Sequence, residues 1–197
     1  MMAIVPYPSP NHHNEVGLRP MVSSLVNRSE LTNARQAVDT GYSWWDARIS
    51  VANMARGDAR GWLLFFGRVR GPTHSFRVPV TADAQHDGTF TVRARGSGSD
   101  YQLVTDGWPP SSTPLLAADL VTVGDQLMRL DKNVITDASG IAILKFHAPL
   151  RRIVADNTVV EAKRPWLLAS LPENSPMLTI GLARIQAGFS FDVSEAY

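Results

Sequence analysis

The sequence predicts a mainly β protein: an antiparallel β-sandwich or split barrel with one short helix and an extended N-terminal arm. Short runs in which apolar and polar residues alternate recur along the chain, as they do in half-buried strands. Glycine and proline turns separate these runs, and a single stretch has the apolar spacing of a helix. Many short strands with few helices favour a sandwich or a barrel over a parallel sheet.

The composition is that of a globular protein without a strongly charged partner. Of 197 residues, 44% are hydrophobic and 19% are charged, and the net charge is +1. The chain therefore lacks the strong positive electrostatic field that would attract nucleic acid or an anionic membrane. The absence of cysteine excludes disulfides, thiol nucleophiles and thiolate metal sites. No window approaches the roughly 20 apolar residues of a membrane helix, and an export-signal pattern is lacking at the first residues. We expect a soluble protein that is not exported.

Residues 1–20, rich in proline, asparagine and histidine, are expected to form the extended arm, and residues 21–197 a single β-rich domain. The domain begins with a strand in MVSSLVNRSEL. A turn at Gly41-Tyr42-Ser43 is expected to lead into a second strand, WWDARISV. Alternate residues of this second strand are apolar, which predicts one buried face.

The stretch NMARGDARGWLLFF is predicted to be the helix. Its apolar residues fall on one helical stripe, namely Ala55, Ala59, Trp62, Leu63 and Phe66. Asn53 has the side chain of an N-cap. The tripeptide Arg56-Gly57-Asp58 lies within this helix, where it cannot adopt the loop conformation of an adhesion motif.

The rest of the chain is predicted to form further antiparallel strands. These are expected in HSFRVPV, FTVRARG, YQLVTDGW, LVTV, QLMRLD, KNVITD, IAILKF, TVVEAK, WLLASL and LARIQAGFSFDVSEAY. Gly124-Asp125 is the expected hairpin turn between LVTV and QLMRLD. The residues from Asp137 to Gly140 form the turn before IAILKF, and Pro79 favours the edge or end of a sheet.

Residue types that serve in catalysis are present, but not in the patterns that catalytic sites use. Among the histidines, His12 and His13 are adjacent and point apart on an extended chain, and no pair has the i, i+2 or i, i+4 spacing of metal ligands. A nucleophile elbow, a Walker A loop and a dinucleotide fingerprint are all lacking. We therefore predict no catalytic residues, no metal and no cofactor.

Two alternatives stay open at this point. A glycosidase would need two carboxylates in one pocket, from among Asp83, Asp87, Asp100 and Asp106, although aspartate is also a common turn residue. A carbohydrate-binding β-sandwich would use Tyr101 and Trp108 as a stacking surface beside the loop at residues 96–100. Large aromatics also serve in cores and subunit contacts.

Four stretches, taken in order, resemble the distal tail family of long-tailed bacteriophages. They are WLLFFGRVRGPTHSF after the tryptophan strand, GSGSDYQLVTDGWPPSSTPLLAADLVTVGDQLMRL, VITDASGIAILKFHAPLR and FSFDVSEAY. The resemblance extends over most of residues 44–197. The chain departs from the family pattern at Ala118-Asp119, where a Gly-Asp is usual, and at Ala148, where a proline is. Alanine fits any position that does not require a positive φ, so the topology is unaffected.

The resemblance implies a structural virion protein and not an enzyme. Six copies would close into a ring that joins the tail tube to the baseplate or tail-tip hub. The ring would be assembled in the bacterial cytoplasm and carried in the virion tail. Its partners would be further copies of itself, the tube protein and the hub protein. For the contacts between subunits we expect the arm and the corner formed by His147, Arg151 and Arg152.

Overall fold

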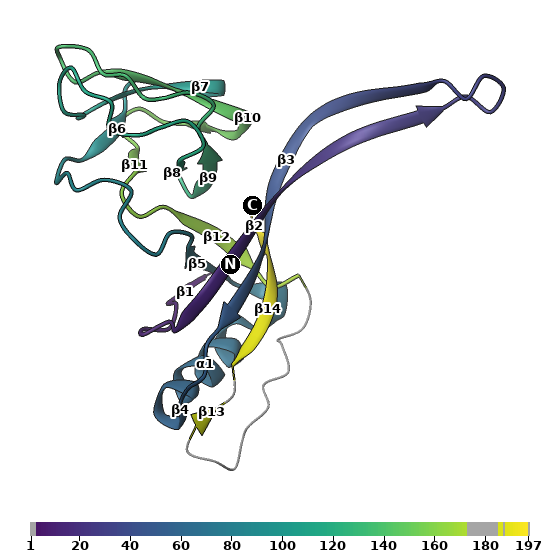
Figure 1. The fold of residues 1–197 in the computed structure, drawn as a ribbon, viewed down its shortest axis with the longest axis vertical. Coiled ribbons are helices and arrows are strands. Elements are labelled where there is room, and N and C mark those ends of the chain that lie inside the picture. Colours follow the sequence, from purple (N-terminus) through teal and green to yellow (C-terminus); the bar gives the residue numbers. More distant parts are fainter. Residues whose placement is uncertain (1–2, 173–184, 187, 197) are drawn as a thin grey trace. The chain divides into compact units, whose positions relative to one another are not determined.

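The structure is a computed structural model that describes residues 3–172, 185–186 and 188–196. Within these residues the protein is mainly β with one α-helix, as predicted (Figure 1). The chain divides into two compact units, where a single domain was expected. The first combines Met1–Arg19, Trp45–Val80 and Trp166–Tyr197, and the second combines Pro20–Trp44 with Thr81–Pro165.

The sheet of the first unit has six strands in the order β1-β5-β12-β14-β3-β2. Their bounds are β1 (Ile4–Val5), β2 (His13–Arg28), β3 (Arg35–Val51), β5 (Ser75–Pro79), β12 (Trp166–Ser170) and β14 (Phe189–Glu195). The strand β14 pairs with β3 in antiparallel register, from Phe189 opposite Val51 to Ser194 opposite Asp46. The short β1 pairs with β5 in parallel. Two further strands, β4 (Met54–Ala55) and β13 (Ile185–Gln186), form a separate antiparallel pair.

The helix α1 (Arg56–Val69) begins three residues later than the predicted N-cap. Ala55 occupies the cap position, and the Asn53 side chain instead accepts a hydrogen bond from the Gly188 N–H at 2.6 Å. The buried face is also displaced: Phe65 and Val69 are buried, whereas Leu63 is exposed. The helix ends where Arg70 adopts a left-handed conformation, just before the 3-10 turn η1 (Gly71–Thr73).

The N-terminal segment is extended but belongs to its own chain's sheet. Ile4 and Val5 pair with β5, and Tyr7 packs among Trp62, Phe65 and Phe76 with ring centroids 5.3 to 5.8 Å apart. The strand β2 runs through the expected boundary at residue 20, from His13 to Arg28, and the two compact units also divide between Arg19 and Pro20.

The expected turn at residues 41–43 is also wrong. The strand β3 passes through Gly41 without a break, and the chain turns at residues 29–34 instead. There the Ser29 N–H donates to the Ala34 carbonyl and the Asn33 N–H donates to the Ser29 carbonyl. Asn33 takes the positive φ of 56° that this turn requires, a conformation that asparagine tolerates.

The sheet of the second unit has the order β10-β7-β6-β11-β8-β9 and curls into a nearly closed barrel. The strands are β6 (Val92–Ala94), β7 (Gly98–Asp106), β8 (Leu120–Val123), β9 (Gln126–Arg129), β10 (Ala142–Val154) and β11 (Val159–Glu161). A bridge between Leu130 and Phe146 joins the two ends of the sheet. The split-barrel form of the prediction is confirmed here, including the hairpin turn at Gly124-Asp125. Ala118, just before β8, has a positive φ of 76°, so the expectation that this position does not require one is wrong.

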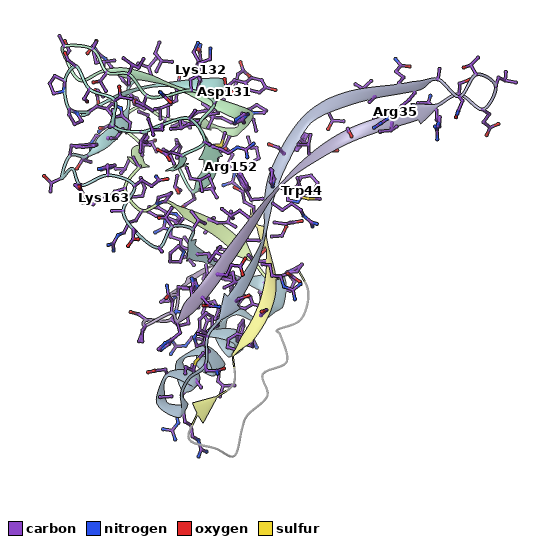
Figure 2. All side chains as sticks on the ribbon, viewed as in Figure 1. Arg35, Trp44, Asp131, Lys132, Arg152 and Lys163 are labelled. Carbon is purple, nitrogen blue, oxygen red and sulfur yellow. The ribbon has the colours of Figure 1, made fainter. Side chains whose placement is uncertain are left out.

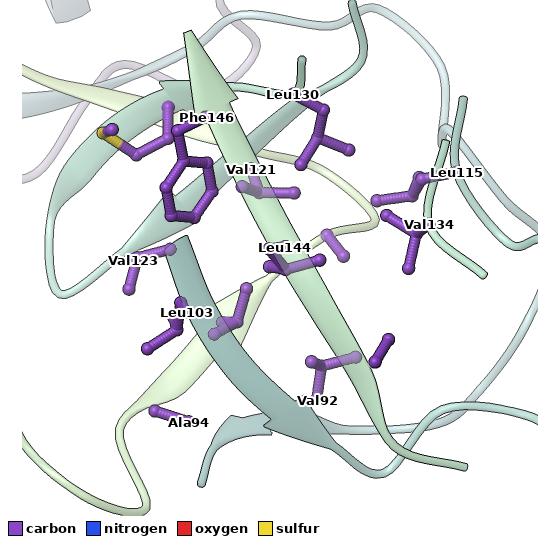
Figure 3. Close-up of a cluster of buried hydrophobic side chains, with 14 of the residues drawn as sticks. Val92, Ala94, Leu103, Leu115, Val121, Val123, Leu130, Val134, Leu144 and Phe146 are labelled. Atoms are coloured by element: carbon purple, nitrogen blue, oxygen red, sulfur yellow. The ribbon is translucent and has the colours of Figure 1, made fainter. Parts of the chain in front are cut away.

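Apolar side chains fill this barrel (Figure 3). Ala142, Leu144 and Phe146 of β10 point inward, and the residues between them point outward, as the alternation of the sequence predicts. Trp108 is part of the same core. Its indole N–H donates to the Thr105 hydroxyl at 2.8 Å, which satisfies its polar atom.

The turn before β10 is the one that the sequence predicts. The Asp137 carboxylate accepts hydrogen bonds from the Ser139 and Ile141 N–H groups at 2.8 and 2.9 Å. Gly140 has a φ of 71°, and a Cβ atom there would lie 2.3 Å from the Trp108 carbonyl oxygen. Only glycine fits this position. Residues 182–184, 187 and 197, in the predicted closing strands, lie outside the described residues, as do residues 1–2 of the arm.

Candidate functional site

The candidate functional surface is the outer part of the β2–β3 hairpin, residues 20–44, which we call the distal hairpin (Figure 1). Every residue from 24 to 38 is exposed. Large apolar side chains are nevertheless frequent there, namely Val22, Leu25, Val26, Leu31, Val38 and Tyr42. Two arginines and two acidic residues leave it without net charge. The surface is therefore suited to a protein contact.

Apolar side chains lie on both faces of the distal hairpin. Val22 and Val26 share one face of β2, and Leu25 lies on the other, because successive strand residues alternate. Between residues 24 and 38 neither face is covered within the described part of the chain. A two-stranded hairpin alone in water is marginally stable at best, and an open strand edge is a template for pairing. Both properties favour a partner that covers this element.

The tip of the hairpin presents one leucine fully to solvent. Leu31 is 98% exposed and follows Glu30. The turn around it is held from within: the Thr32 N–H donates to the Ser29 hydroxyl at 3.2 Å, and the Ala34 N–H donates to the Thr32 hydroxyl at 3.4 Å. The tip is thus an ordered apolar knob beside a carboxylate. Figure 2 shows Arg35 at the start of β3, close to this closed end.

The predicted Arg151-Arg152 corner exists, but its backbone is engaged inside the chain. Gln126, a buried residue of β9, accepts hydrogen bonds on Oε1 from the Arg151 and Arg152 N–H groups at 2.8 and 3.0 Å. The Gln126 amide also donates to the Arg152 carbonyl at 3.2 Å. This amide holds β9 to β10 where a bulge shifts the β10 register. The Arg151 guanidinium donates to the Ser43 carbonyl at 3.0 Å. Arg152 is exposed and keeps its expected role as a prediction.

His147, the third residue predicted for this corner, lies on the outer face of β10. Its Nδ1 is 3.7 Å from an Asp131 carboxylate oxygen, and both side chains are about half exposed. An exposed pair at this distance contributes little to stability. The structure thus places His147 on the barrel surface and not in a cluster of catalytic groups.

The pair of aromatics expected to stack on a sugar does not form. Tyr101 is 50% exposed, but Trp108 is 4% exposed and belongs to the barrel core. This prediction is wrong because Thr105, three residues before Trp108, offers the indole N–H a buried partner.

The four aspartates considered for a glycosidase occupy separate turns and strand ends. Asp83 and Asp87 lie between β5 and β6, Asp100 lies in β7 with a positive φ, and Asp106 ends β7 opposite Arg93. Among residues 3–172, 185–186 and 188–196, no group of three or more histidine or acidic side chains could hold a metal ion.

Two histidines near the N-terminus take part in the packing of the first unit. The His13 Nε2 atom lies 2.7 Å from the Tyr7 hydroxyl, and burial lowers the pKa of His13 and raises that of Tyr7. The His12 Nε2 atom lies 3.1 Å from an Asp58 oxygen, so Asp58 of the Arg-Gly-Asp tripeptide contacts the N-terminal segment. The contact between His12 and Asp58 joins that segment to α1.

Comparison with known proteins adds no relative. No protein-family model matches the chain, and no curated protein matches its sequence. None of the helical residues that the structure describes forms a segment long and apolar enough to cross a membrane. The distal hairpin was missed as a unit in the sequence because its turn, SELTNA, contains no glycine or proline. The signal that could have found it is the run of turn-forming Ser29, Thr32 and Asn33 between two alternating stretches.

Proposed function

We propose that this protein is a structural ring component of a bacteriophage tail, of the distal tail type, which joins the tail tube to the tail-tip hub. The single observation that carries the proposal is the distal hairpin, an uncharged ribbon with apolar side chains exposed on both faces. The proposal includes no catalytic role.

The stretches that resemble the distal tail family support the proposal by their positions. They cover α1 with the turn into β5, the strands from β7 to β9, the turn before β10 with most of that strand, and β14. They therefore include turns that connect successive strands, and not only strand surfaces.

The distal hairpin supports assembly from identical copies. An exposed element that binds a different surface of the next copy makes a head-to-tail contact, and such contacts generate rings when the rotation closes. A ring would also cover the open edge of β2. The near-neutral charge of the whole chain permits close approach of copies. The tube protein above and the hub below would be the other partners.

The test is the solution mass of the purified protein, with negative-stain imaging of the particles. We expect a closed ring, of six copies if the resemblance holds, either alone or with the tube protein. A strictly monomeric protein under both conditions would contradict the proposal.

A shortened variant links the ring to the hairpin. The Thr40 hydroxyl donates to the Ser23 carbonyl at 2.7 Å, so these two residues face each other across the ribbon. Residues 24–39 can therefore be replaced by Asn-Gly, which favours a tight hairpin turn. We expect a folded protein, by circular dichroism and cooperative melting, that no longer assembles. The matched control replaces the exposed Asn27 alone with serine, which keeps the hairpin and should keep assembly.

A further inference from the structure

A groove opens in the wall of the barrel beside β10. Its volume is about 470 Å³, within the roughly 300–1,000 Å³ of sites that hold small ligands or side chains. Three isoleucines line it, Ile135, Ile141 and Ile143. Lys132 and Lys145 also line it, and both are exposed. Figure 2 shows Lys132 next to Asp131, on the segment that follows β9.

The groove exists because two segments separate between two hydrogen bonds. The Asp131 N–H donates to the Lys145 carbonyl at 2.8 Å, and the Asp137 N–H donates to the Ile141 carbonyl at 2.9 Å. Between these bonds residues 132–136 turn away from β10: the Val134 and Thr136 N–H groups donate to Leu115 and Ser112. The strand expected at KNVITD is therefore reduced to one bridge, between Val134 and Leu115.

Because the segments separate, the backbone of β10 at Ile143 is unpaired on this side among the described residues and is available to a further strand. The carbonyls of Ile141 and Lys145 point toward residues 131–137, so the N–H and C=O of Ile143, between them, point the same way. No hydrogen bond of the described residues joins residues 132–136 to β10. The groove thus offers backbone groups as well as apolar side chains, which is the arrangement that binds extended segments.

The charge of the groove favours an acidic partner. The lining contains two lysines and one carboxylate, Asp137. That carboxylate already accepts two backbone N–H groups of its own turn, whereas neither lysine forms an ion pair within the described residues. A carboxylate beside an apolar side chain would match both features of the site.

The chain itself carries such a segment at the tip of the distal hairpin. Leu31 is the most exposed large apolar side chain of the described residues, and Glu30 precedes it. The leucine complements the three isoleucines, and the glutamate complements the two lysines. The tip is also ordered by its own hydrogen bonds, which reduces the entropy lost on binding.

We propose that the groove beside β10 binds the hairpin tip of a second copy of this protein, with Leu31 among the isoleucines and Glu30 near Lys132 and Lys145. This inference rests on the proposed ring and specifies the contact that closes it. Each copy then inserts its tip into the next, a head-to-tail contact that repeats around the ring.

The first experiment uses the absence of cysteine from the chain. The variants L31C and I143C are purified separately, mixed and oxidised. We expect disulfide-linked dimers that contain one copy of each. The control pairs L31C with I153C, another exposed isoleucine of β10 that does not line the groove. Equal cross-linking of both mixtures, or no cross-linking of the first, would overturn the inference. So would a double L31C/I143C variant that forms its disulfide only within one chain.

The second experiment measures assembly by sedimentation of folded variants. Leu31→Ala should weaken association by about 30-fold, as loss of a central contact residue does, whereas Ile153→Ala should not. The pair K132E/K145E should also weaken association, and adding E30K should restore part of it. If K132E/K145E associates as tightly as the unaltered protein, and adding E30K does not change its association, the contact between Glu30 and the two lysines is refuted.

The two proposals fail in different ways. Rings of the unaltered protein that tolerate L31A and K132E/K145E would remove the groove contact and leave the proposed function in place. A protein that is monomeric with and without the tube protein would remove both.

Discussion

The barrel and the distal hairpin are both built from antiparallel strands, but the barrel buries its apolar side chains and the distal hairpin exposes them. In the barrel, β10 turns Leu144 inward and leaves Ile143 outside, so each side chain has a definite face. In the distal hairpin both faces carry apolar residues, and from residue 24 to residue 38 neither face is covered within the described part of the chain. The barrel can be stable by its own packing, whereas the hairpin depends on what meets it. Substitutions in the barrel core should therefore lower the free energy of unfolding, whereas substitutions in the distal hairpin should reduce assembly.

The largest effect is expected in the barrel core. Leu144→Ala removes a fully buried side chain and leaves a cavity, which should lower the free energy of unfolding by about 2–5 kcal/mol. Urea unfolding followed by fluorescence measures it. Ile143→Ala, the neighbour on the outer face, is the matched control and should change little. Similar losses in the free energy of unfolding for both variants would mean that Leu144 and Ile143 do not lie on the inner and outer faces of β10 as described.

A smaller effect is expected at the β9–β10 corner. Gln126→Ala leaves the Arg151 and Arg152 N–H groups without their acceptor, at a cost of about 1–3 kcal/mol. Arg152→Ala at the same corner keeps the Gln126 acceptor and both backbone N–H groups, because the Arg152 side chain is exposed, so it should cost less. The same urea measurement ranks the two variants. If Gln126→Ala were the milder change, the corner would not depend on these bonds.

A pH-dependent effect is expected where the N-terminal segment packs on α1. Burial lowers the pKa of His13 below its ordinary value of 6.5, so the unfolded chain binds a proton more readily than the folded one. Stability is then lost as the pH falls below 6.5 toward the folded pKa. His13→Gln should flatten this part of a plot of melting temperature against pH. An unchanged slope would assign the dependence to other groups, of which His86 is one, since burial lowers its pKa too.

The smallest effect on folding is expected in the distal hairpin. Val22→Ser, Leu25→Ser and Val26→Ser, made singly, should each change the free energy of unfolding by less than about 0.5 kcal/mol, because these side chains are already exposed. Combined, they should reduce assembly, which a sizing column detects. A large loss of stability in the dissociated protein would show that the hairpin is packed against its own chain.

The sequence predicts local structure well because local structure has local causes. Alternation in LVTV and QLMRL around Gly124-Asp125 defines β8 and β9, and Asp137 and Gly140 define the turn before β10. Errors arise where a residue type has two uses. Gly41 indicated a turn but lies within β3, and Trp108 indicated a surface for sugars but packs in the core. The groove could not be predicted, since it depends on the pairing of residues 134 and 115.

The pairing of β3 with β14 has a consequence for synthesis. Val51 lies opposite Phe189, while residues 81–165 of the barrel come between them in the chain. On a ribosome the barrel can close as soon as its own strands have emerged, since domains fold as units during translation. The N-terminal strands emerge first and wait longest, with β3 lacking its neighbour until β14 is made. During that interval the nascent chain exposes the strand edge most prone to wrong partners, and we expect chaperones to bind it there.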